Sequence, residues 1–183
     1  MNDIWRICRV LSQKGRLKLL WLLFENGEQC VNQLVLRSEM TRPNTSIQLK
    51  TLHLSGLIRF RREGMNVIYR AEADPRVKCA VPLLEALRSC FDSDISFESI
   101  IRQVTAFTHE RRVEVVRVLQ DGPLSFVQLE DHCGMTSSAL SRHLLKLEVR
   151  KVVRWDGERY ALTLPKEQLG NVLLGIVCQK EAP

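Results

Sequence analysis

The chain has 183 residues, 45% of them hydrophobic, and its 27 Lys and Arg residues exceed its 21 Asp and Glu residues for a formal charge of +6. This size allows two small domains with separate cores, and apolar runs fall short of the roughly 18 residues that a membrane span needs. The charged N-terminal segment lacks the apolar region of a signal peptide, so we expect a cytoplasmic protein without a membrane partner.

The first two predicted helices cover residues 3–13 and 15–25. Apolar residues recur at helical spacing in the first segment, which predicts an amphipathic helix, whereas the second segment is apolar nearly all round and predicts a buried central helix. Asn26 and Gly27 follow the second segment, and both residue types tolerate the left-handed conformation that ends a helix.

A helix-turn-helix is predicted next, from a short helix over residues 30–37 and a second helix that starts near Pro43. Proline suits the first turn of a helix because its missing N–H has no partner there. The spacing of the second helix directs Thr45, Leu49 and Leu52 toward the core and leaves polar residues to face outward. Residues 57–72 then alternate around a Glu-Gly turn, which predicts a basic hairpin, or wing.

The same plan repeats 95 positions downstream, and we expect this register to hold without a gap from Arg16 to Glu63. Matching pairs include Arg16 with Arg111, Gly27 with Gly122, Met40 with Met135, Ser46 with Ser141, and Leu49 with Leu144. A helix over residues 75–91, kinked or broken at Pro82, closes the first copy. The second copy is predicted to contain helices over 97–107, 111–119, 124–133, 137–147 and 166–179, and a hairpin that turns on Asp156 and Gly157.

These patterns predict a mainly α fold with small β-hairpin wings, built as two tandem winged helix-turn-helix domains over residues 1–92 and 96–183. Residues 1–95 carry 15 Lys and Arg against 10 Asp and Glu, and the remaining residues carry 12 against 11. The basic excess therefore lies in the first copy, where we expect the stronger grip on an acidic polymer.

The run from the central helix through the wing resembles the ArsR/SmtB family of bacterial winged-helix repressors, and it does so in both copies. The first copy has the family's Arg16-Leu17 opening of the central helix and its Arg62-Glu63-Gly64 wing turn. The second copy has a recognition signature over residues 141–147, SRHLLKL. The first copy departs from this signature at Ile47 and Gln48, so we expect its base preferences to differ.

The resemblance implies double-stranded DNA as the partner, and residue chemistry agrees with the implied contacts. Gln48 suits adenine, Arg142 suits guanine, and Ile47 or Ala139 suits a thymine methyl group. Hydroxyl and basic side chains of the helices and wings suit phosphates. The predicted DNA-contacting set is Arg42, Asn44, Thr45, Ser46, Gln48, Lys50, Arg61, Arg62, Ser137, Ser138, Ser141, Arg142, His143 and Arg159.

Six scattered cysteines form no C-x-x-C motif, which favours reduced thiols over a disulfide framework. The family's arsenic-type site, E-x-C-V-C-x-L, has Asn32 in place of the second thiolate here, so we predict no metal and no cofactor. A thiol group made from Cys79 and Cys90, joined by Cys8 and Cys178, stays open, although packing in the core is the favoured role.

The leading interpretation is a sequence-specific transcriptional regulator, by resemblance a repressor, whose two copies form an intramolecular pseudo-dimer. The alternative is a protein-interaction or chromosome-organising module of paired winged helices, which the nearly neutral second copy would suit. An enzyme is not expected, because phosphate-loop, metalloprotease and nucleophile-elbow motifs do not occur. The operator, the inducer, the direction of regulation and any further dimerisation stay open.

Overall fold

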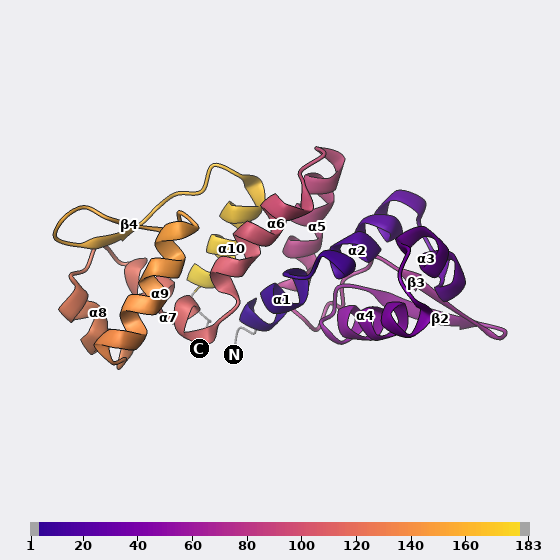
Figure 1. Ribbon diagram of the computed structural model, residues 1–183, viewed down its shortest axis with the longest axis horizontal. Helices are drawn as coiled ribbons and strands as arrows, with labels where there is room; N and C mark the ends of the chain where they lie inside the picture. Colours follow the sequence, from indigo (N-terminus) through magenta and orange to yellow (C-terminus); the bar gives the residue numbers. More distant parts are fainter. Residues whose placement is uncertain (1–3, 180–183) are drawn as a thin grey trace. The chain divides into compact units, whose positions relative to one another are not determined.

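A computed structural model describes residues 4–179 of the chain, which fall into two compact units. The first unit contains residues 10–101, and the second contains residues 1–9 and 102–183. This division differs from the predicted boundaries because it runs through two helices, α1 (Ile4–Leu11) and α6 (Phe97–Val104), so each unit includes part of both. Figure 1 shows the elements of each unit.

The first unit is a helical bundle with a small sheet along one side (Figure 1). Its elements are α2 (Lys14–Asn26), β1 (Gln29–Cys30), α3 (Val31–Ser38), α4 (Arg42–Leu54), β2 (Arg59–Glu63), β3 (Asn66–Arg70) and α5 (Ala80–Asp92). The antiparallel sheet has the order β1-β3-β2, and Gly64 and Met65 connect the two longer strands. Leucines from α2, α3 and α4 form the buried centre.

The second unit repeats this arrangement with a shorter wing. It contains the 3-10 turn η1 (Thr105–Phe107), α7 (Glu110–Leu119), α8 (Phe126–Cys133), α9 (Ser137–Val149), β4 (Val153–Trp155), β5 (Tyr160–Leu162) and α10 (Gln168–Cys178). Leu124 forms an isolated antiparallel bridge with Tyr160, in the place that β1 occupies in the first unit. The predicted fold class, two tandem winged helix-turn-helix domains, is therefore confirmed.

The helix-turn-helix segments keep the 95-residue offset at both ends, since α3 matches α8 and α4 matches α9. Left-handed backbone also recurs at matching positions. Glu39 and Gly134 end the first helix of each pair with φ angles of 61° and 56°, and Gly56 and Lys151 follow the second helix with 77° and 58°. The repeat therefore extends to the backbone conformation of the connecting turns.

The central helices α2 and α7 contradict the unbroken 95-residue register. The Arg16 guanidinium donates to the carbonyl of Val10, six residues earlier, and its counterpart is Arg112, which donates to the Ala106 carbonyl at 2.7 Å. An offset of 96 also aligns the buried residues of the two helices better than 95 does. The adjacent arginines, Arg111 and Arg112, concealed this shift. Leu119 and Leu129 are therefore one position closer in sequence than their counterparts Leu23 and Leu34.

Two further boundaries differ from the sequence prediction. Helix α5 starts at Ala80 rather than at residue 75, because Asp74 and the residues after it form successive turns, with Val77 N–H donating to Asp74 O at 2.9 Å. Pro82 then lies in the first helical turn, where its missing N–H needs no partner and causes no break. In the second wing, Asp156 N–H donates to Arg159 O at 3.2 Å, so Gly157 and Glu158 are the central turn residues.

Within residues 4–179, no helix has both the length and the apolar character that crossing a bilayer requires.

The left-handed residue Glu39 provides a test of the turn between α3 and α4. We expect Glu39→Gly to raise the free energy of unfolding by about 1 kcal/mol, because glycine adopts positive φ without the steric cost that a Cβ brings. The lost Lys18–Glu39 ion pair contributes little, because its atoms are 3.9 Å apart and the Glu39 carboxylate is exposed. Urea unfolding measures the change. The reciprocal Gly134→Glu, where a Cβ would meet no atom within 4 Å, should destabilise by a similar amount.

Candidate nucleic-acid interface

Helix α4 presents a polar outer face because its other face is held in the core. Thr45, Leu49 and Leu52 are fully buried, whereas Asn44, Ser46 and Lys50 are exposed. The helix starts at Arg42 after Thr41 in extended conformation, with Pro43 in its first turn. Ile47 is 62% exposed and lies on the outer face.

Thr45 is a wrong member of the predicted DNA-contacting set. Its side chain is 0% exposed, and its hydroxyl donates to the Thr41 carbonyl at 3.1 Å. The side chain therefore anchors the start of α4 instead of facing outward.

Gln48 belongs to a hydrogen-bonded chain that sequence reasoning missed. The Arg16 guanidinium donates to Gln48 Oε1 at 3.0 Å, and Gln48 Nε2 donates to Asn44 Oδ1 at 2.9 Å. Arg16 comes from α2 and is itself held by the Val10 carbonyl, and partial burial lowers its pKa. Arg16 thus fixes which end of the Gln48 carboxamide presents oxygen and which presents N–H.

The arginines of the first wing lie on opposite faces of the sheet, because side chains alternate along a strand. Arg61 pairs with Glu28 at 2.8 Å and with Glu63 at 3.3 Å, and these hydrogen bonds raise its pKa. Arg62 is exposed on the opposite face and forms no ion pair with any residue between 4 and 179. Of the two predicted phosphate contacts, Arg62 is available, whereas Arg61 is already paired with carboxylates.

The face that carries Arg62 lies toward the end of α4. Phe60, two residues earlier on the same face, packs on His53 of α4 with ring centroids 4.7 Å apart and on Tyr69 of β3 at 5.7 Å. Met65 is fully exposed in the turn at the tip of this wing. The aromatic contacts therefore connect the wing to the helix whose polar face is exposed.

Helix α9 of the second unit has the same division of faces. Leu140, Leu144 and Leu147 are buried, and the exposed predicted contacts are Ser137, Ser138, Ser141 and Arg142. The Arg142 guanidinium donates through Nε to the Ser138 carbonyl at 3.1 Å.

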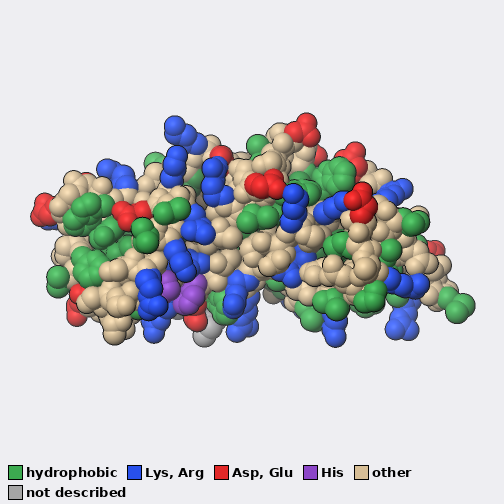
Figure 2. Space-filling view, viewed as in Figure 1, with side chains coloured by type: hydrophobic (Ala, Val, Ile, Leu, Met, Phe, Trp, Pro, Cys, Tyr) green, Lys and Arg blue, Asp and Glu red, His purple; other side chains and the backbone are tan. Residues whose placement is uncertain are grey.

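The second wing is smaller and less basic than the first. Arg159 is exposed, with its backbone N–H bonded to the Asp156 carboxylate at 2.8 Å and its guanidinium 3.8 Å from Glu158. Trp155 is 44% exposed and packs on Tyr160 with ring centroids 4.6 Å apart. Figure 2 shows Lys and Arg side chains on the visible face of each unit, with hydrophobic side chains scattered among them.

Comparison with known proteins decides the family. Residues 13–59 and 109–150 match the family described as bacterial regulatory protein, arsR family. The chain is 32% identical over 81 residues to the uncharacterized HTH-type transcriptional regulator MJ1325 of Methanocaldococcus jannaschii, a match that covers 44% of this chain and 90% of that relative. The chain belongs to the arsR family.

A second relative is the HTH-type transcriptional regulator KmtR of Mycobacterium tuberculosis, 33% identical over 66 residues. That match covers 36% of this chain and half the length of KmtR. The two family matches coincide with the two helix-turn-helix segments, which confirms the tandem ArsR-type repeat. The protein is a DNA-binding transcriptional regulator of this family.

The ArsR-like cysteine segment of the first unit has a structural role. Cys30 caps α3, with its sulfur accepting the Gln33 N–H while Gln33 Oε1 accepts the Cys30 N–H at 2.8 Å. Ser125 and Gln128 form the same capping box in the second unit. Cys8, Cys79, Cys90 and Cys133 are buried, as predicted for core cysteines. Among residues 4–179, no three His, Cys, Asp or Glu side chains are grouped as metal ligands.

His143 takes the place of Gln48 in the second unit, and its ring faces inward. The ring packs on His109, the N-cap of α7, with centroids 4.7 Å apart, and the buried Nδ1 has no hydrogen-bond partner. Burial lowers the pKa of His143 to about 4, with further contributions from His109 and from the positive charges of Arg112, Lys146 and Arg142. In this state His143 supports the position of α9, and its Nδ1 is not open to a base.

The lowered pKa predicts that acid destabilises the second unit. An unfolded histidine takes a proton near pH 6.5, whereas folded His143 resists it until about pH 4, so stability falls as pH decreases through this window. We expect His143→Gln to lose less stability than the wild type between pH 7 and pH 4.5, measured by urea unfolding. His132→Gln, at an exposed position, is the control, and equal losses in all three proteins would contradict the assignment.

Proposed function

We propose that one chain supplies both halves of an operator-binding surface and acts as an intramolecular pseudo-dimer on double-stranded DNA. The observation that supports this proposal is the matched pair α4 and α9, which have equal length, the same offset as their preceding helices and buried residues at the same three positions. In helix-turn-helix dimers the second helix enters the major groove, and two half-sites lie about 34–36 Å apart.

The two helices would read different bases, so the preferred operator is an imperfect palindrome. In the first unit, the oriented carboxamide of Gln48 suits the N6 and N7 atoms of adenine, and exposed Ile47 suits a thymine methyl group. In the second unit, Arg142 suits guanine. His143 takes the place of Gln48 and faces inward, so this unit has no carboxamide for adenine at that position.

Phosphate contacts would come mainly from the first unit. Arg42 and Lys50 are both exposed on α4, and Arg62 is exposed on the wing face that lies toward this helix. Ser46, Ser137, Ser138 and Ser141 offer exposed hydroxyls for further phosphate oxygens. Occupation of a promoter by this surface would exclude polymerase, so we propose repression, in the cytoplasm where the DNA lies.

Stoichiometry tests the pseudo-dimer. A duplex that contains both half-sites, obtained by selection from random sequences, should bind one chain per duplex in analytical ultracentrifugation. A duplex with one half-site should bind more weakly, since only one recognition helix contributes base contacts. Two chains per full site would refute the pseudo-dimer. As a control, Arg142→Ala should weaken binding to the full site but leave binding to the first unit's half-site unchanged.

The Arg16–Gln48 contact predicts a graded loss of sequence specificity. We expect Gln48→Ala to cost about 1–3 kcal/mol on the selected site and to relax the preference at one base pair. Arg16→Lys should relax the same position by a smaller amount, because one amine cannot hold both the Val10 carbonyl and Gln48 as the guanidinium does. Competition binding with site variants measures both, and Lys50→Ala, a phosphate-contact control, should weaken all sites alike.

A further inference from the structure

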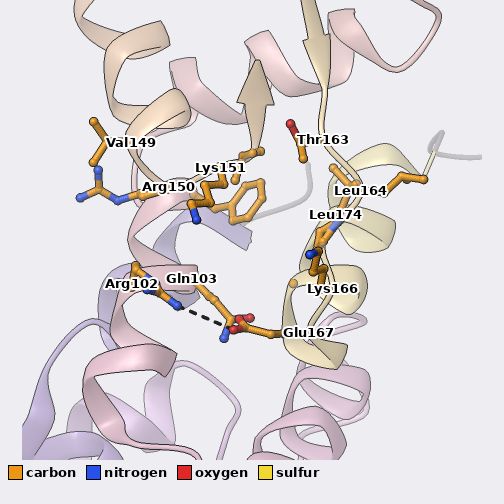
Figure 3. A pocket seen from close by; sticks show the side chains of 14 residues that line it. Arg102, Gln103, Val149, Arg150, Lys151, Thr163, Leu164, Lys166, Glu167 and Leu174 are labelled. Atoms are coloured by element: carbon orange, nitrogen blue, oxygen red, sulfur yellow. Dashed lines mark ion pairs between the residues drawn. The ribbon is translucent and has the colours of Figure 1, made fainter. Parts of the chain in front are cut away.

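The second unit contains a pocket that the DNA-binding surface does not use. Its volume is about 280 Å³, and it is bounded by the end of α6, the turn after α9, the end of β5 and the start of α10 (Figure 3). Phe107 and Val152 are buried in its apolar lining, and Leu174 closes one side. Gly170 lets Pro165 pack directly on α10, because a Cβ there would lie 2.7 Å from the proline ring.

The pocket also carries more positive than negative charge. Arg102, Arg150, Lys151 and Lys166 line it, and Glu167 is the one carboxylate among the lining residues. Glu167 pairs with Arg102 at 3.7 Å, a contact drawn as a dashed line in Figure 3. Three cationic side chains therefore line an apolar cavity without a carboxylate from the lining to balance them.

The cationic side chains come from different elements and are partly held in place. The Arg150 guanidinium donates to Thr105 Oγ1 at 2.9 Å and to the Lys146 carbonyl at 3.1 Å, so it is fixed by neutral acceptors. Lys151 follows α9 with a left-handed backbone, whereas Lys166 precedes α10 on the other wall. Donors from separate segments around an apolar base are the usual arrangement in a small-molecule site.

We propose that this pocket binds a small organic anion, a carboxylate attached to an aliphatic or aromatic body. The apolar base would take the body, and Lys151 and Lys166 would hold the carboxylate through charge-assisted hydrogen bonds. The volume suits a molecule of about ten to fifteen non-hydrogen atoms, at the small end of ligand sites. The excess of positive charge disfavours a metal cation or an amine in the same place.

This site would also give the regulator an effector, a consequence that rests on the proposed function of α9. Residues 149–152, which end α9 and lead into β4, line the pocket directly. A ligand that binds one position of this segment more tightly than another changes the affinity of α9 for DNA. By linkage, DNA changes the affinity of the pocket for the ligand by the same factor.

Calorimetric titration of the full chain without DNA tests the pocket itself. The probes are octanoate and 2-naphthoate, with octanol, 2-naphthol and octylamine as matched neutral and cationic compounds. We expect at least one of the two carboxylates to bind about tenfold or more tightly than its neutral analogue, since a charge-assisted contact is lost in the analogue. Failure of both carboxylates to bind, or equal affinity for carboxylate and analogue, would overturn the proposal.

Variants locate the binding. Lys151→Gln combined with Lys166→Gln should weaken carboxylate binding about tenfold or more, whereas Arg154→Gln, outside the pocket, should leave it unchanged. Leu174→Trp should fill the cavity and abolish binding, and Asn171→Trp, exposed on the same helix, should not. Circular dichroism confirms that each variant is folded. Undiminished binding by both the lysine variant and Leu174→Trp would refute this site.

A DNA titration with and without the carboxylate then tests the effector role separately. A change in operator affinity that disappears in Leu174→Trp supports the coupling, and unchanged affinity contradicts it. If the ligand-free protein fails to bind the operator, the proposed function is contradicted. The calorimetric result on the pocket would still stand in that case.

Discussion

The structure depends on the burial of one narrow face of each recognition helix. Thr45, Leu49 and Leu52 hold α4, and Leu140, Leu144 and Leu147 hold α9. Each fully buried leucine contributes about 1.5–3 kcal/mol, far more than an exposed hydrogen bond or ion pair, so these side chains decide how each helix is rotated. The polar residues on the outer face point outward because this anchoring sets the rotation of the helix.

The two copies keep this anchoring and diverge around it. In the first unit, an arginine of the central helix orients Gln48, and the wing next to it exposes Arg62. In the second unit, the matching Arg112 is buried and bonded to the Ala106 carbonyl, while His143 packs on His109 with an unpartnered Nδ1. A conserved backbone thus carries two different chemical surfaces, which is why an imperfect palindrome is the expected target of one chain.

Divergence also explains how one repeat can acquire a ligand site. Lys151 has the left-handed position that glycine has in the first copy, and its side chain adds a positive charge to the rim of the pocket. A non-glycine residue with positive φ costs stability, so a functional gain at this position would offset the strain. In the first unit, Cys30 has a structural role instead of a ligand-binding one. It lies in the segment that corresponds to the family's thiolate site, and it caps α3.

By itself, the sequence determined the repeat, the winged helix-turn-helix fold, the starts of the recognition helices and most of their exposed residues. These features follow from local periodicity, turn chemistry and family motifs, and each of these signals lies within a short stretch of sequence. Tertiary structure decided the pairing of Arg61 with Glu28, the link from Arg16 to Gln48 and the one-residue shift between α2 and α7. Each of these joins residues on separate elements or depends on how two separate helices align, and side-chain spacing within one segment carries no information about either.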